Sequence, residues 1–256
     1  IQSGTLILPG SVDISYSSAL KKEAILLSKY LQESKLTTKL YSGKSDAMIQ
    51  LQISPTTLSA HKEGYVLQIS NQNIQIKSSS STGIFYGIQT LRQLIGKYPD
   101  RRLPQLTITD YPNFSWRAFM LDEARYFKGK EVVCRLLDQM AYLKMNTFHW
   151  HLTDDQGWRI EIKKFPKLTE IGSYRDSSEI NHFESDVFDG KPHSGYYTQK
   201  EIKEIIEYAR ERHINIVPEI EMPGHASAAI ASYPWLGTNN ESIKVPGKFG
   251  VHYNVY

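Results

Sequence analysis

The chain of 256 residues contains a single cysteine, Cys134. One cysteine excludes an internal disulfide and a metal cluster held by several thiolates. Cys134 lies among Val132, Val133, Leu136 and Leu137 at helical spacing. We therefore expect a buried structural thiol rather than a nucleophile.

Long apolar runs and clusters of one charge are lacking as well. No run approaches the ~20 apolar residues that a spanning helix needs, so no membrane span is expected. Lys and Arg number 30 against 27 Asp and Glu, and no basic cluster with interleaved aromatics occurs, so no nucleic-acid partner is expected. No glycine-rich dinucleotide motif or phosphate loop occurs, and no cofactor is implied. The chain begins at Ile1 without a methionine, from which we expect an exported protein, in the periplasm, at the cell surface or secreted.

What is present indicates a globular α/β protein, with 40% hydrophobic and 11% aromatic residues. Residues 1–112 are predicted to form a small α/β domain. It should contain a helix with Leu20, Ala24, Leu27 and Leu31 on one face, short alternating strands at 49–53, 65–69 and 74–76, and a second helix after the serine tract 78–81. Turn residues at 110–113 suggest the boundary.

Residues 113–256 alternate between strand and helix patterns, which is typical of parallel β/α units. We expect strands at 118–125, 146–155 and 214–221 and helices at 131–145 and 226–231. A capping box at 198–201 should open another helix, buried through Ile202, Ile205, Ile206 and Ala209. Residues 176–195 read as a long loop. The absence of nucleotide motifs favours a barrel over a doubly wound sheet.

Ionisable residues are concentrated at the ends of the three expected strands. Consecutive parallel strands end side by side, so these groups should converge on one mouth. Strict alternation would place His151 and Asp154 on opposite faces, unless the strand ends before Thr153. The groups are Asp122, Glu123 and Arg125 at the first end, His149, His151, Asp154 and Asp155 at the second, and Glu219, Glu221 and His225 at the third.

Two chemistries fit such a mouth. His149 and His151 lie two apart on a strand and could bind a metal together with His225, as in a barrel metallohydrolase. The other is glycoside hydrolysis, which needs a carboxylic acid to protonate the leaving oxygen and a group that stabilises charge at the anomeric carbon. Composition alone does not choose between them.

Three long motifs resemble those of glycoside hydrolase family 20, the β-N-acetylhexosaminidases. They lie at residues 116–127, 140–160 and 217–225, and the second includes His-Trp-His-Leu-Thr-Asp-Asp-Gln-Gly-Trp at 149–158. Residues 82–92 are similar to the α/β domain that precedes the barrel in that family. The resemblance implies a (β/α)8 TIM-type barrel and an exo-acting enzyme that removes terminal β-linked N-acetylglucosamine or N-acetylgalactosamine from a small-molecule glycan. It also implies retention through attack by the substrate's own acetamido oxygen.

The resemblance also implies roles for single residues. Arg125 matches the arginine that holds the sugar O3 and O4 hydroxyls. Asp154 and His225 match a pair that supports the catalytic glutamate, and His151 and Glu221 are given supporting roles behind them. No metal is implied.

One part of the family pattern is missing. The family has an adjacent Asp-Glu pair, whose Glu is the general acid/base, at the end of the fourth barrel strand, and no such pair follows His225. Residues 113–256 have room for about three β/α units. We therefore expect the N-terminal part of a longer enzyme, with the proton donor beyond Tyr256. A non-catalytic carbohydrate-binding relative of the fold is the alternative.

Overall fold

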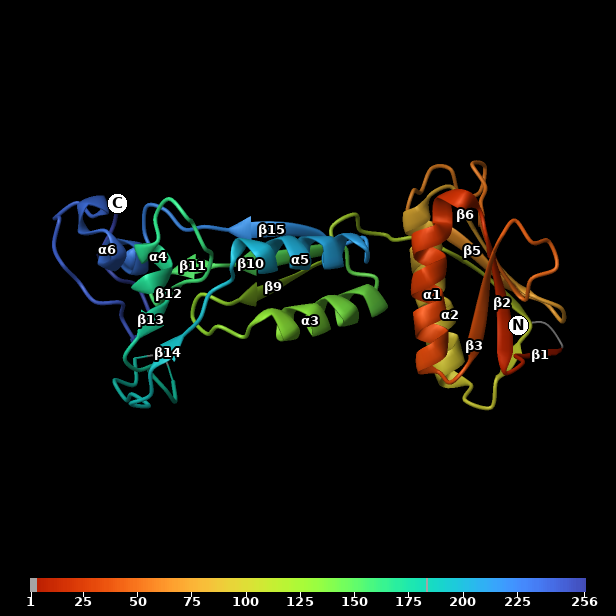
Figure 1. The fold of residues 1–256 in the computed structure, drawn as a ribbon, viewed down its shortest axis with the longest axis horizontal. Coiled ribbons are helices and arrows are strands. Elements are labelled where there is room, and N and C mark those ends of the chain that lie inside the picture. The colour runs from red at the N-terminus through yellow and green to blue at the C-terminus, as the bar shows by residue number, and fades with distance from the viewer. Residues whose placement is uncertain (1–3, 183) are drawn as a thin grey trace. The chain divides into compact units, whose positions relative to one another are not determined.

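The computed structural model describes residues 4–182 and 184–256. The chain divides into two compact units (Figure 1). One comprises residues up to Trp116 together with Ala141–Lys144, and the other comprises Arg117–Met140 and Met145–Tyr256. No helix among the described residues is both long and apolar enough to cross a membrane.

The first unit is built on a six-stranded mixed sheet in the order β3-β2-β4-β6-β5-β8. Strands β3, β2, β4 and β6 run parallel, whereas β5 is antiparallel to both β6 and β8. A separate pair joins β1 and β7. The strands are β1 (Thr5–Ile7), β2 (Ser11–Tyr16), β3 (Thr37–Ser42), β4 (Ile49–Ile53), β5 (Tyr65–Ile69), β6 (Ile74–Ser78), β7 (Arg102–Pro104) and β8 (Leu106–Asp110).

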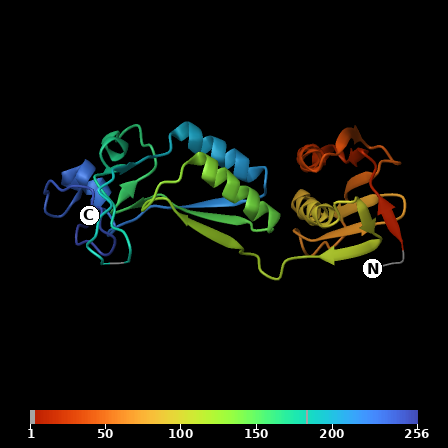
Figure 2. The same ribbon diagram turned by 90° about the horizontal axis from the view of Figure 1, so that it is seen from below.

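Two helices, α1 (Lys21–Glu33) and α2 (Ser81–Lys97), lie on the same side of this sheet (Figure 2). The predicted face is confirmed, because Leu20, just before α1, and Ala24, Leu27 and Leu31 within it are all buried. Helix α2 begins where the serine tract ends, and the Ser80 side chain accepts a hydrogen bond from the Gly83 amide as its N-cap. At Gly87 a Cβ would lie 2.5 Å from Ile76 Cγ2, so glycine lets α2 pack closely on the sheet.

The second unit contains a three-stranded parallel sheet in the order β15-β10-β9. Its strands are β9 (Ala118–Asp122), β10 (Thr147–His151) and β15 (Asn215–Glu219). Helices α3 (Lys130–Tyr142) and α5 (Gln199–Arg210) cover one face of it (Figure 2). Alternation along β10 puts the fully buried Phe148 and Trp150 on one face and His149 and His151 on the other.

The predicted strand 146–155 is interrupted, which is a correction with consequences for the site. β10 ends at His151, and Thr153–Asp154 forms a short strand, β11, antiparallel to β12 (Gly157–Trp158). The Leu152 amide donates to the Glu219 carbonyl at 3.3 Å, and the chain then turns into the β11–β12 hairpin. The strict alternation assumed along the predicted strand therefore stops at His151.

Two helix predictions also need correction. Helix α3 ends at Tyr142 rather than 145, since Lys144 has a positive φ of 59° and the Met145 amide returns to the Met140 carbonyl. Helix α5 begins with the predicted capping box. Ile205 and Ala209 are buried as expected, but Ile202 is half-buried and Ile206 is 49% exposed.

The predicted loop 176–195 is closed at its base by a short antiparallel pair, β13 (Tyr174–Arg175) and β14 (His193–Ser194). The predicted small-residue helix is α6 (Ser227–Ser232), which packs with α4 (Lys167–Glu170) around Trp158. A short 3-10 turn, η2 (Pro234–Leu236), follows α6, and another, η1 (Ser18–Leu20), precedes α1.

Candidate active site

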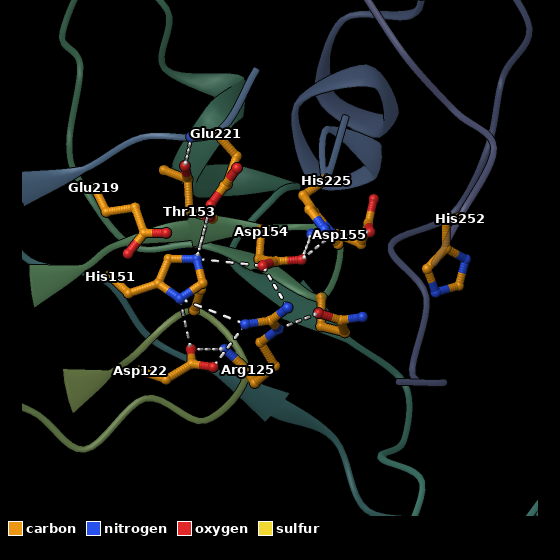
Figure 3. Close-up of polar contacts among 12 residues, drawn as sticks. Asp122, Arg125, His151, Thr153, Asp154, Asp155, Glu219, Glu221, His225 and His252 are labelled. Atoms are coloured by element: carbon orange, nitrogen blue, oxygen red, sulfur yellow. Dashed lines mark hydrogen bonds and ion pairs between the residues drawn. The ribbon is translucent and has the colours of Figure 1, made fainter. Parts of the chain in front are cut away.

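The three parallel strands end level with one another. In the sheet register His151 on β10 lies opposite Asp122 on β9 and Glu219 on β15. All three side chains are therefore on the same face, at the carboxyl edge of the sheet, which is where barrel enzymes place their chemistry. The predicted convergence of the strand ends is observed, and Figure 3 shows the resulting cluster.

Arg125 lies between Asp122, His151 and Asp154 in this cluster (Figure 3). Its Nη1 lies 2.8 Å from Asp122 Oδ2, and its Nη2 lies 2.7 Å from Asp154 Oδ2. Its Nε donates to Gln156 Oε1 at 3.2 Å. Two carboxylates and an amide thus fix the plane of a guanidinium that is still 32% exposed, so it keeps N–H groups for a ligand.

His151 and Asp154 form a buried ion pair behind Arg125. The hairpin brings Asp154 back beside the strand end, so His151 Nε2 lies 3.2 Å from Asp154 Oδ2. Burial alone lowers the pKa of His151, but the hydrogen bond to Asp154 and the charges of Asp122 and Glu219 outweigh it and raise that pKa. Burial alone raises the pKa of Asp154, but its bonds to His151 and to the Asp155 amide, with the charge of Arg125, lower it. Both shifts favour the charged pair.

His225 is held by two adjacent carboxylates. Its Nδ1 lies 3.1 Å from Asp154 Oδ1 and 3.0 Å from Asp155 Oδ2. The other oxygen of Asp155 accepts from the Ser227 amide at 3.0 Å and from its hydroxyl at 2.5 Å, at the start of α6. Since carboxylates only accept, Nδ1 of His225 carries the proton and the ring, 37% exposed, has a fixed orientation.

Glu219, the last residue of β15, and Glu221, just after it, line one side of the cluster. Glu219 Oε2 lies 2.6 Å from His149 Nε2, and Glu221 Oε1 lies 3.6 Å from His151 Nε2. Partial burial, followed by its hydrogen bond to Glu219, raises the pKa of Glu221. The Thr153 hydroxyl accepts from the Glu221 amide at 3.0 Å and joins this segment to β11.

Two groups of side chains among the described residues have possible metal-ligand atoms within 4.8 Å of one another. One is His151 with Glu219 and Glu221, and the other is Asp154 and Asp155 with His225. The predicted His-x-His pair is not one of them, because His149 contacts Glu219 whereas His151 turns to Asp154 and to the Thr153 carbonyl. The positive charge between the carboxylates of Asp122 and Asp154 is the guanidinium of Arg125.

The structure brings together all five predicted site residues, Arg125, His151, Asp154, Glu221 and His225. Asp122, Asp155 and Glu219 were recognised as strand-end groups but given no role, and Gln156 was not singled out. The only feature of the sequence that points to these four residues is their position next to a predicted strand end.

Cys134, expected to be buried, is only half-buried, and burial raises the pKa of its thiol.

Comparison with known proteins identifies the family. Residues 114–255 match the model of the glycosyl hydrolase family 20 catalytic domain, and residues 1–111 match domain 2 of the same family. The chain is 43% identical over 209 residues to a beta-hexosaminidase of Porphyromonas gingivalis, covering 78% of this chain and 26% of that protein. It is 45% identical over 196 residues to a beta-hexosaminidase of Vibrio furnissii, covering 76% and 31%.

Solved structures agree with this assignment. A beta-N-acetylhexosaminidase from Bacteroides fragilis superposes with a TM-score of 0.82 at 36% identity, covering 97% of this chain and 47% of that one. The Streptomyces plicatus enzyme gives 0.83 at 32% identity, covering 99% and 50%. The chain thus spans about half of these structures and less than a third of the two curated relatives. The predicted fold, an α/β domain followed by β/α units of a TIM-type barrel, is confirmed, and the chain belongs to glycoside hydrolase family 20.

Proposed function

We propose that the protein containing this chain is an exo-acting β-N-acetylhexosaminidase. It would release terminal, non-reducing β-linked N-acetylglucosamine or N-acetylgalactosamine with retention of configuration. The observation that carries the proposal is Arg125, a partly exposed guanidinium fixed by Asp122, Asp154 and Gln156 at the carboxyl edge of a parallel sheet in a family 20 chain.

Arg125 is suited to hold the hydroxyls of a terminal sugar. Its planar fork is fixed by the groups behind it, so little side-chain freedom is lost when a ligand binds. In the proposal its remaining N–H groups donate to O3 and O4, which makes the contact available only at a non-reducing end. His151 and Glu221 lie behind this arrangement, because His151 contacts the Asp154 carboxylate that holds Arg125 and also contacts Glu221.

Asp154 and His225 support the acid that protonates the leaving oxygen. Nδ1 of His225 is oriented by Asp154 and Asp155, so its Nε2 can accept from a neighbouring carboxylic acid and fix that acid's rotamer. The proton donor would be a glutamate that is not among residues 1–256. The acetamido oxygen of the substrate takes the place of an enzyme nucleophile and forms an oxazolinium, which water then opens.

Two aryl glycosides test this mechanism in the full-length protein. An aryl N-acetyl-β-glucosaminide should release its chromophore, whereas the matched aryl β-glucoside, which carries a hydroxyl in place of the acetamide, should not. Equal hydrolysis of both would contradict substrate assistance. Saccharide binding without hydrolysis of either would instead favour a non-catalytic carbohydrate-binding protein.

A further inference from the structure

Two arginines with fully buried side chains lie directly beneath the candidate site. Arg159 is 0% exposed and Arg175 is 1% exposed. Burial, and then the neighbouring charge of Arg175, lower the pKa of Arg159 to about 9, which still leaves it cationic at neutral pH. Burying a cation is costly unless its N–H groups are satisfied, so their partners indicate what these residues do.

Most of these partners are backbone carbonyl oxygens around Arg125. Arg175 Nη2 donates to the Arg125 carbonyl at 2.7 Å, and its Nη1 donates to the Gln156 carbonyl at 3.1 Å. The Gln156 side chain in turn accepts from Arg125 Nε. The Arg175 guanidinium therefore fixes the backbone of both residues, Arg125 and Gln156, whose side chains contact each other.

Arg159 holds the same segment from the residues before Arg125. Its Nε donates to the Glu123 carbonyl at 3.1 Å, and its Nη2 donates to the Ala124 carbonyl at 2.9 Å. Its Nη1 donates to the carbonyls of Ser173 and Gly195. The carbonyls of three successive residues, 123, 124 and 125, are thus all bound by buried guanidinium groups.

These arginine contacts hold a segment of the backbone that belongs to no helix or strand. β9 ends at Asp122 and α3 begins at Lys130, so the residue that would contact the sugar lies in an irregular segment. A guanidinium can bind several carbonyls in fixed directions, whereas a lysine ammonium carries its three rotatable donors on a single nitrogen. These contacts need the several N–H groups of a guanidinium, in fixed directions, and not only a positive charge.

We propose that Arg175, assisted by Arg159, is a positioning residue that sets the backbone of Arg125 and thereby its contact with the terminal sugar. The inference rests on the proposed function of Arg125. It predicts that Arg175 acts on substrate through Arg125, so its substitution should have little effect once the Arg125 side chain has been removed.

A double-mutant cycle in the full-length protein tests this coupling. Arg175→Lys should lower kcat/KM for the aryl N-acetyl-β-glucosaminide by roughly ten- to a hundredfold, mainly through KM, since displacements near 1 Å have effects of that size. In an Arg125→Ala background the same substitution should change kcat/KM by less than about twofold. Folded fractions are matched by circular dichroism before rates are compared.

Arg212→Lys is the matched control. Arg212 is also buried and ion-paired, at 2.7 Å from Asp138 after the end of α5, but none of its contacts reaches Arg125. Its substitution should have the same effect on kcat/KM in both backgrounds. Should Arg175→Lys fail to fold, Ser178→Ala removes the 2.9 Å contact of Arg175 Nε and should give a smaller loss that likewise disappears without the Arg125 side chain.

The outcomes separate the two proposals. Multiplicative effects of Arg175→Lys and Arg125→Ala on kcat/KM would overturn the positioning role alone. Wild-type kcat/KM in Arg125→Ala would contradict the role of Arg125 and the positioning role with it. If the wild-type protein binds N-acetylglucosamine without hydrolysis, the hydrolase proposal fails, and the same cycle measured on that affinity supports or refutes the coupling.

Discussion

Nδ1 of His225 lies 3.0 Å from Oδ2 of Asp155, and Asp155 is completely buried. The same carboxylate binds the backbone and hydroxyl of Ser227, so it connects the histidine to the first residue of α6. Asp154 also contacts His225, but its other oxygen is committed to Arg125 and His151. Both aspartates therefore hold His225, but only Asp154 also holds Arg125 and His151.

Substitution of each aspartate should separate these contacts in the full-length protein. In Asp155→Asn the amide NH2 group faces a donor at either His225 or Ser227, so the imidazole loses its orientation. We expect kcat to fall by more than about tenfold with little change in KM. Asp154→Asn should raise KM more strongly, because it weakens the support of Arg125. Steady-state kinetics checks this, and the same pattern for both variants would contradict the division.

The His151–Asp154 ion pair should make stability depend on pH. The pKa of His151 is raised in the folded protein, so its contribution is complete below its unfolded pKa of about 6.5 and is lost as pH rises through the folded pKa. The pKa of Asp154 is lowered, so its contribution is present above an unfolded pKa of about 3.9 and is lost as pH falls through the folded value. The pair should stabilise most between these two unfolded values.

Urea unfolding of the wild type and of His151→Gln measures the His151 contribution. The difference in unfolding free energy should be largest near pH 5 to 6. It should shrink from about pH 6.5 up to the folded pKa, because over that range the unfolded chain has lost the proton that the folded histidine still holds. A difference that grows toward pH 9 would show that His151 is neutral in the folded protein.

His193 provides the opposite case in the same unit. Its Nε2 accepts a hydrogen bond from the Phe127 amide at 2.9 Å. Burial, and then the charges of Arg175 and Arg159, lower its pKa to about 4. Between about pH 6.5 and 4 the histidine binds a proton in the unfolded chain but not in the folded protein. The free energy of unfolding should therefore decrease as the pH is lowered over that range. His193→Gln should remove this slope, and an unchanged slope in the variant would assign it to other groups.

Gly157 should not accept a side chain. A Cβ there would lie 2.1 Å from Nη2 and 2.3 Å from Cζ of Arg159, whose guanidinium is completely buried and is held by several carbonyls. Gly157→Ala should destabilise the protein by about 1–3 kcal/mol, the usual cost of overpacking. Thermal or urea unfolding checks this.

Gly96 is the control for that substitution. It lies in α2, and a Cβ there would meet nothing within 4 Å. Gly96→Ala should be neutral or stabilising by up to about 1 kcal/mol, because alanine favours the helix. Equal destabilisation of both variants would mean that close packing on Arg159 is not the cause.

Much of the fold could be predicted from periodicity. The buried stripe of α1, the start of α2 after the serine tract, the capping box of α5 and the three parallel strands are all observed, because each depends on residues close together in the chain. Strand β3, with the sequence Thr-Thr-Lys-Leu-Tyr-Ser, was not predicted. It lies at the edge of the sheet and lacks a clear apolar alternation.

Part of the candidate site also follows from the sequence, and the rest depends on tertiary contacts. The sequence by itself determined which residue types gather at the strand ends, since a parallel sheet must bring Asp122, His151 and Glu219 to one edge. Only the tertiary structure decided that β10 stops at His151, because the hairpin that returns Asp154 to it depends on contacts with β15 and the loop after β9. The same holds for Arg159 and Arg175: most of their partners are backbone carbonyls, which every residue carries, so no side-chain pattern in the sequence reveals them.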